Sequence, residues 1–186
     1  MIYYVDPATT KGNAVGGFLG PNLACLAWCW PDPRWELVAG SFYAATGPTL
    51  FELPELRPRP KVKRKGVNPT ALGNDLIAIT GAGASVAGML GQWHGTRSVK
   101  VSVWKGQIAK PLHHDKLWAI LLPHERALFP APKGYPSVEA YIKQGVDTYA
   151  RTREVSGYSA SVVDLLDVAA LGCYDHNRLR VRGDWR

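Results

Sequence analysis

Cysteine is scarce in this sequence, and the three that occur are Cys25, Cys29 and Cys173. Their number is odd and their spacing matches no zinc-ligand pattern, which argues against a disulfide framework and against a structural zinc site. We therefore predict reduced thiols in the core of a cytoplasmic protein.

A long apolar run is also missing. The longest mainly apolar stretch, residues 76–90, contains three glycines and is too short to span a bilayer. The first residues lack the basic and apolar pattern of a secretory leader. From these absences we expect a soluble, cytoplasmic protein that has no membrane partner.

Acidic residues are outnumbered by basic ones. The 186 residues include 15 Asp and Glu against 22 Lys and Arg, a net charge of +7, which favours a polyanionic partner, with nucleic acid the first choice. With 46% hydrophobic and 20% charged residues, the chain has the composition of a folded protein. Because it shows no internal repeat and no long linker, we predict a single domain over residues 1–186.

The spacing of apolar residues predicts an α/β fold whose sheet begins with antiparallel strands. A turn at Gly20-Pro21-Asn22 joins the second and third strands. Residues 34–45 are predicted to be a short helix or an irregular crossover. The predicted strands are 1–5, 13–19, 23–30, 49–53 and 97–104, and the predicted helices are 69–92, 111–122, 137–149 and 161–174.

Four carboxylates lie in apolar elements: two are at or near the ends of predicted strands, and two are within the last predicted helix. Asp6 ends the first strand before Pro7, and Glu52 ends the strand at 49–53. The last helix is apolar nearly all round, and its only charges, Asp164 and Asp167, share one face. A buried carboxylate is costly without a partner, so a metal site is favoured, with capping or salt-bridged acids as the alternative. Such a set suits two Mg²⁺ ions roughly 4 Å apart, with Mn²⁺ able to substitute, in phosphodiester cleavage.

The order of these motifs resembles the ribonuclease H-like fold and, within it, the RuvC family of Holliday-junction resolvases. The resemblance rests on Asp6-Pro7-x-Thr9 in an antiparallel hairpin, an acidic strand, a helix, a further strand and a closing helix with Asp164-x-x-Asp167. The segment 103–110, followed by His113-His114 and 122–126, resembles phage and prophage members. The resemblance implies a mixed sheet in which three antiparallel strands are followed by parallel strands, with helices on its flanks. For a phage-encoded protein it also implies the cytoplasm of a bacterial host cell.

The resemblance also implies roles for individual residues. The four metal-binding carboxylates would be Asp6, Glu52, Asp164 and Asp167, and Lys105 and Lys110 would contact the substrate near the metals. His113 and His114 are interpreted as ordinary helix residues, with polarisation of the attacking water as the alternative. The sequence departs from the family at Ala8, where glycine is usual, and in the shortened crossover at 34–45. We therefore expect the family's homodimer to form through a smaller interface, or through the helix at 69–92.

The most basic segment of the chain is residues 57–68, which carries no acid. Pro58, Pro60 and Gly66 argue against regular structure there. A solvated charge run is the alternative, but beside an acidic metal site we expect contact with the DNA backbone. Asn68, at the start of a helix, would add backbone N–H groups for a phosphate. The predicted DNA-binding residues are Arg57, Arg59, Lys61, Lys63, Arg64, Lys65 and Asn68.

The function predicted from these features is Mg²⁺-dependent cleavage of branched DNA, foremost resolution of four-way junctions. A DNA-binding module without catalysis is the non-enzymatic alternative, and a metal-dependent nicking assay separates the two. A single lobe related to acetate and sugar kinases is a third possibility, since Asp6-x-x-Thr9-Thr10 resembles their phosphate loop. Those enzymes need two such lobes, whereas this chain has the length of one.

Overall fold

The computed structural model describes residues 1–8, 12–30, 34–41, 47–53, 69–92, 94–106, 108–155 and 158–180, with the backbone alone for residues 69–76. Among these residues, no helix has the length and apolar character needed to cross a membrane.

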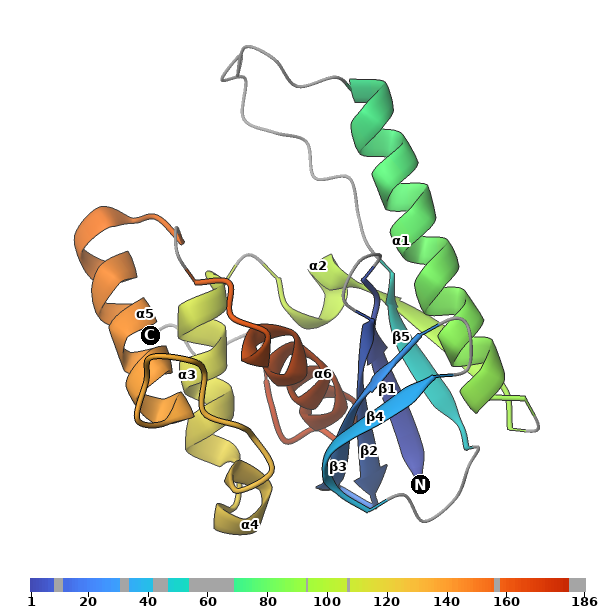
Figure 1. The fold of residues 1–186 in the computed structure, drawn as a ribbon, viewed down its shortest axis with the longest axis horizontal. Coiled ribbons are helices and arrows are strands. Elements are labelled where there is room, and N and C mark those ends of the chain that lie inside the picture. The colour runs from blue at the N-terminus through green and yellow to red at the C-terminus, as the bar shows by residue number, and fades with distance from the viewer. Residues whose placement is uncertain are drawn as a thin grey trace.

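A six-stranded mixed sheet of order β4-β3-β2-β1-β5-β6 forms the centre of the fold (Figure 1). Four strands at one side are antiparallel, whereas β5 is parallel to β1 and β6 is parallel to β5. The predicted α/β class, with a mixed sheet flanked by helices, is confirmed. The strands are β1 (Ile2–Asp6), β2 (Asn13–Leu19), β3 (Asn22–Cys29), β4 (Trp35–Gly40), β5 (Thr49–Leu53) and β6 (Thr96–Lys100).

The prediction of a helix or crossover at residues 34–45 is wrong for residues 35–40, and residues 42–45 lie outside the described part of the chain. Residues 35–40 are strand β4, which pairs antiparallel with β3 from Cys25↔Gly40 to Cys29↔Trp35. The fold therefore has four antiparallel strands where three were predicted. An edge strand needs apolar residues on one side only, and here Leu37 stays 48% exposed, so the periodicity of this segment is weak. Gly40 closes the strand with φ of +84°, a conformation that favours glycine.

The strand predicted at residues 97–104 is confirmed for residues 97–100 and wrong for residues 101–104. The structure has β6 over Thr96–Lys100 and then a single helical turn, α2 (Val101–Trp104). The alternating valines continue into α2, which misleads a prediction based on period-two spacing. The turn is closed by the Lys105 N–H, which donates to the Val101 carbonyl at 2.9 Å. It buries Trp104 and precedes α3 (Lys110–Ile120), which packs on α5 (Val138–Thr152) and α6 (Val162–Asp175).

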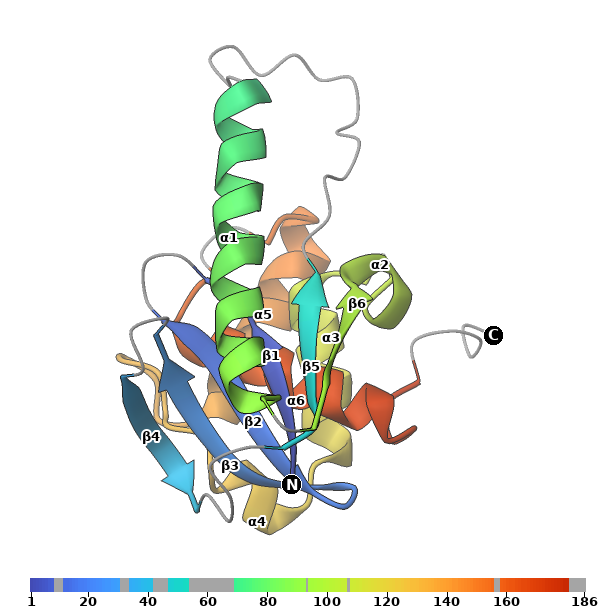
Figure 2. The same cartoon turned by 90° about the vertical axis from the view of Figure 1, so that its right-hand side faces the viewer.

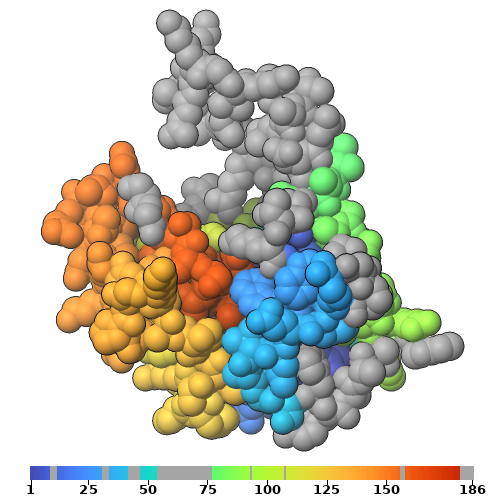
Figure 3. All heavy atoms as spheres, viewed as in Figure 1, coloured from blue at the N-terminus to red at the C-terminus, as the bar shows by residue number. Residues whose placement is uncertain are grey.

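Helices cover both faces of the sheet (Figures 1 and 2). On one face α1 (Pro69–Leu90) packs on β5 and β1, and on the other α6 (Val162–Asp175) packs on β1, β2 and β3. Outside α6 lie α3 (Lys110–Ile120) and α5 (Val138–Thr152), with α4 (Pro123–Arg126) against β3. The four predicted helices are thus present. Ser137 caps α5, since its hydroxyl accepts from the Ala140 N–H at 3.1 Å. In Figure 3 the yellow and orange atoms of the helical half lie beside the blue atoms of the strands.

Two apolar clusters follow from this layering. The larger one lies between the sheet and α6 and includes Tyr4, Phe18 and Leu166, whereas the smaller one lies under α1 and includes Tyr3 and Val5. The predicted core thiols are confirmed, because Cys25, Cys29 and Cys173 are buried and reduced.

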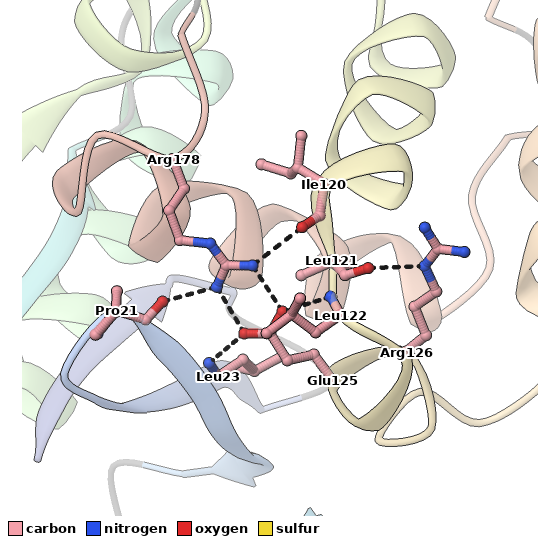
Figure 4. A network of polar contacts seen from close by, with 8 residues as sticks. All are labelled: Pro21, Leu23, Ile120, Leu121, Leu122, Glu125, Arg126 and Arg178. Atoms are coloured by element: carbon pink, nitrogen blue, oxygen red, sulfur yellow. Dashed lines mark hydrogen bonds and ion pairs between the residues drawn. The ribbon is translucent and has the colours of Figure 1, made fainter.

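A buried ion pair joins α4 to the segment after α6 (Figure 4). Arg178 donates to both oxygens of Glu125, at 2.6 and 2.7 Å, and also to the carbonyls of Pro21 and Ile120. Glu125 additionally accepts from the N–H groups of Leu23 and Leu122, at 2.7 and 2.8 Å. These bonds connect β3, α3, α4 and the chain after α6 at one point.

Candidate active site

Asp6 and Glu52 lie at the same end of the sheet because β1 and β5 are neighbouring parallel strands and each acid is at or near the end of its strand. Figure 2 shows β1 beside β5. Val5 pairs with Phe51, and each acid is the residue that follows. Side chains alternate between faces along a strand. Since Tyr4 and Leu50 belong to the cluster below α6, Asp6 and Glu52 are directed to the α6 side as well.

Asp167 meets these two acids from α6. It is 2% exposed, and with Asp6 and Glu52 it lines a cavity of about 480 Å³. Asp164 is one turn earlier in α6 and close enough to act electrostatically on Asp6, but it does not line this cavity. The remaining lining residues are Val101, Lys105, Ile108, Ala109, Lys110 and Val155.

Both predicted lysines reach this cavity. Lys105, in the turn after α2, is 5% exposed and donates to Asp167 Oδ1. Lys110, the first residue of α3, donates to Asp167 Oδ2 at 2.6 Å and has a side chain that is 40% exposed. The structure therefore brings together Asp6, Glu52, Asp167, Lys105 and Lys110, with Asp164 beside them.

The electrostatics of the cavity are dominated by acids that repel one another. Burial and the negative charges of Glu52 and Asp167 hold the pKa of Asp6 well above its ordinary value. Burial and Asp167 raise the pKa of Glu52 to about 7. Burial alone would also raise the pKa of Asp167, but Lys105, His114 and Lys110 hold it well below the ordinary value. In the cavity the charged form of Asp167 is therefore favoured, whereas burial and repulsion disfavour the charged forms of Asp6 and Glu52, which a further cation would stabilise.

A hydrogen-bonded chain holds Asp167 from its buried side. His114 Nε2 lies 2.9 Å from Asp167 Oδ1, and His114 Nδ1 lies 3.0 Å from the Tyr158 hydroxyl. Burial lowers the pKa of His114, so the ring is neutral and has one donor and one acceptor. Because the carboxylate only accepts, Nε2 carries the proton and Nδ1 accepts from Tyr158.

Sequence reasoning did not assign this chain of residues to the site. The sequence favours an ordinary helix residue at His114, with polarisation of the attacking water as the alternative, and it does not indicate Tyr158. The one available signal was a pair of histidines directly after the lysine-containing segment 103–110. Nothing local marks Tyr158, which is separated from His114 by 44 residues.

His113, His114 and Asp167 form a compact group whose possible ligand atoms lie within 4.8 Å of one another. A metal there would have to displace one of the two hydrogen bonds that engage the His114 ring. Lys105 also opposes a cation at this point, because it donates to Asp167 and its positive charge acts on His113. Burial and Lys105 lower the pKa of His113 to about 3, so that ring is a neutral residue packed edge-on against Trp104.

The carboxylates of the cavity suit a hard divalent ion better. Mg²⁺ and Mn²⁺ prefer oxygen ligands, which Asp6, Glu52 and Asp167 supply. Glu52 Oε2 is buried and makes no hydrogen bond of standard geometry among the residues described, although the indole N–H of Trp104, which is also unpaired, is near enough to lower the Glu52 pKa. An orphaned buried carboxylate oxygen is unfavourable unless a cation or a proton occupies that position. The donor set therefore fits Mg²⁺.

The predicted DNA-binding residues Arg57, Arg59, Lys61, Lys63, Arg64, Lys65 and Asn68 lie outside the described part of the chain. Scans against protein-family models, curated proteins and solved structures found no match to this sequence.

Proposed function

We propose that this protein is a Mg²⁺-dependent endodeoxyribonuclease of the RuvC type that cleaves branched DNA. The observation that supports it most directly is the cavity in which Asp6, Glu52 and Asp167 converge from β1, β5 and α6 beside Lys105 and Lys110. A cluster of repelling carboxylates with an orphaned oxygen fits a metal site for phosphodiester hydrolysis. The net charge of +7 fits a polyanionic substrate.

The topology supports a ribonuclease H-like arrangement as part of this proposal. An antiparallel β1–β2–β3 meander is followed by β5 and β6 parallel to β1, and α6 crosses the sheet with its carboxylates at the ends of β1 and β5. Strand β4 occupies residues 35–40, within the segment where the resemblance implies a crossover helix. The homodimer interface is therefore expected elsewhere, on α1.

The carboxylates of Asp6, Glu52 and Asp167, with Asp164 nearby, would hold the ions. Bound Mg²⁺ supplies an activated water and stabilises the leaving oxygen. Asp167 Oδ1 accepts hydrogen bonds from Lys105 and His114, whereas Oδ2 accepts one from Lys110. Oδ2 is therefore the oxygen that has a lone pair available for a metal ion. The more exposed Lys110 can leave Asp167 for a phosphate oxygen, while the buried Lys105 stays and keeps positive charge at the site.

The test is incubation of the purified protein with four-way junction, flap, duplex and single-stranded DNA, each with Mg²⁺ or EDTA. We expect cleavage in Mg²⁺ and none in EDTA, and we expect the four-way junction to be cleaved most strongly. Binding without cleavage in Mg²⁺ and in Mn²⁺ would instead favour a DNA-binding module that lacks catalysis.

Junction resolution also predicts an assembly. Two symmetry-related phosphates must be cut, which a two-fold dimer achieves with paired sites. Light scattering of the free protein and of its junction complex should show two chains on one junction. A strict one-to-one complex that accumulates single nicks would indicate a flap- or nick-generating nuclease.

A further inference from the structure

A second cavity, of about 300 Å³, lies next to the carboxylate cavity. The two cavities are neighbours because Val155 lines both. The second one is formed mainly by α5 and by residues on either side of it. Its lining residues are Pro111, Tyr135, Tyr141, Gln144, Gly145, Thr148, Glu154, Val155 and Tyr158.

Three tyrosines give this cavity an aromatic wall. Tyr141 is stacked on Tyr158, with ring centroids 4.8 Å apart and an interplanar angle of 12°, and Tyr135 meets Tyr141 edge-on at 4.8 Å. Gly145 makes the arrangement possible, because a Cβ at that position would lie 2.5 Å from the Tyr158 ring. Tyr135 is partly exposed, so its ring is accessible to a ligand.

Besides Pro111, Gly145 and Val155, the rest of the lining is polar, and none of the described residues that line the cavity is basic. The exposed amide of Gln144 both donates and accepts, the Thr148 hydroxyl does the same, and the Glu154 carboxylate accepts. A phosphate would be repelled by Glu154 and would find no cation here. A flat aromatic ligand with donors and acceptors on its edge fits the wall and the polar residues together, and a nucleobase has this chemistry.

The position of the cavity relative to the carboxylates is set by the hydrogen bonds already described. Tyr158 forms part of its wall and is linked through His114 to Asp167. A ligand against Tyr158 is therefore held at a defined place beside the site where a phosphate would be cut.

We propose that this tyrosine-lined cavity binds an unpaired nucleobase of the DNA substrate, next to the scissile phosphate. The proposal rests on the proposed nuclease function. Branched DNA offers unstacked bases at the branch point, which cost less to insert than a paired base. An exocyclic amino group on the base would be recognised by Glu154.

Photo-crosslinking tests the proposal without cleavage. Four-way junctions carry 5-iodouracil or, in a parallel series, 5-iodocytosine, which has the exocyclic amino group that Glu154 would accept from, at one position each near the branch point. They are bound to the full protein in EDTA and irradiated, and the crosslinked residue is identified by mass spectrometry. We expect crosslinks at Tyr135 or Tyr158 from one or two positions. Losing one base–aromatic stack in Tyr135→Ala should lower the yield and the junction affinity roughly tenfold. The control Tyr149→Ala removes a partly exposed tyrosine of α5 that does not line the cavity, and should change neither.

A second variant, Glu154→Gln, changes an exposed residue and keeps the fold. It should alter which base is preferred at the crosslinked position. Crosslinks that map only to other residues, or yields unchanged in Tyr135→Ala, would overturn the proposal. Crosslinks at Tyr135 without cleavage in Mg²⁺ would leave the cavity assignment standing and overturn the nuclease function, whereas cleavage without these crosslinks would do the reverse.

Discussion

Acidic side chains are buried both in the Glu125–Arg178 network and in the carboxylate cavity. Both oxygens of Glu125 have hydrogen-bond donors, whereas the cavity contains a carboxylate oxygen that makes no hydrogen bond of standard geometry among the residues described. Glu125 is fully buried, and its two oxygens accept from a guanidinium and from two backbone N–H groups. Burial alone would raise the pKa of Glu125, but Arg178 and these N–H groups lower it. In the cavity, by contrast, Asp6 and Glu52 have raised pKa values and Glu52 keeps an orphaned oxygen.

This difference separates an acid that stabilises the fold from acids that are set up for a ligand. Satisfied hydrogen bonds and one matched charge offset the cost of burying Glu125. In the cavity Lys105 and Lys110 pair with Asp167, whereas burial and repulsion disfavour the charged forms of Asp6 and Glu52, which a bound metal ion would offset.

Asp6→Asn should reduce DNA cleavage by roughly a thousandfold or more, because a ligand worth several kcal/mol of metal-assisted catalysis is lost. Asp167→Asn should do the same. Junction binding should be retained, and the free energy of unfolding of Asp6→Asn should not fall, because the change relieves repulsion. Single-turnover kinetics measures cleavage, titration of the junction in EDTA measures binding, and urea denaturation measures the free energy of unfolding. Asp115→Asn, an exposed acid of α3, is the control, and near wild-type turnover in either variant would remove that residue from the site.

Glu125→Ala should lower the free energy of unfolding by about 3–5 kcal/mol, because Arg178 and two N–H groups lose their acceptor. The double variant Glu125→Ala/Arg178→Met should recover part of the loss. Urea denaturation measures both, with Glu139→Ala, in the first turn of α5, as the control. A loss below about 1 kcal/mol, the size of a surface pair, would mean that the network does not stabilise the fold.

Tyr158→Phe should weaken Mn²⁺ binding by about 10- to 100-fold, because second-layer partners of metal ligands have effects of this size. The ring stays in place while the hydroxyl that donates to His114 is lost. Calorimetric titration with Mn²⁺ reads this out independently of cleavage. Tyr141→Phe is the matched control, since its hydroxyl accepts from the Ala160 N–H and not from the chain to Asp167. Equal affinity in the two variants would contradict a positioning role.

In EDTA, the contributions of Glu52 and Glu125 to the pH dependence of the free energy of unfolding should have opposite signs. Glu52 has a folded pKa of about 7 against an ordinary 4.5, so the folded protein holds the proton longer. Stability should therefore fall as the pH rises from about 4.5 to 7, and Glu52→Gln should flatten that slope. Glu125 has a lowered pKa, so its contribution is present above its ordinary value of 4.5 and is lost as the pH falls. Urea midpoints across the pH series measure both slopes, and a wild-type slope in Glu52→Gln would contradict the assignment.

The sequence by itself determined the elements that depend on local periodicity and capping. Strands β1, β2, β3 and β5 and the long helices were predicted because apolar spacing and turn residues act over a few positions. The convergence of Asp6 and Glu52 was also predictable, since each acid ends an apolar strand. The weak pattern of β4 and the valines that run into α2 gave local signals that the tertiary structure overrode.

Only the tertiary structure decided which residues complete the site. Asp167 is separated from its partners Lys105, Lys110 and His114 by 62, 57 and 53 residues, and Glu125 is 53 residues from Arg178. No local pattern specifies pairs that far apart, because they depend on where α3 and α6 pack against the sheet. Tyr158 reaches His114 only because Gly145 leaves room for its ring. The types of residue needed for the chemistry could thus be read along the chain, whereas their partners were set by packing.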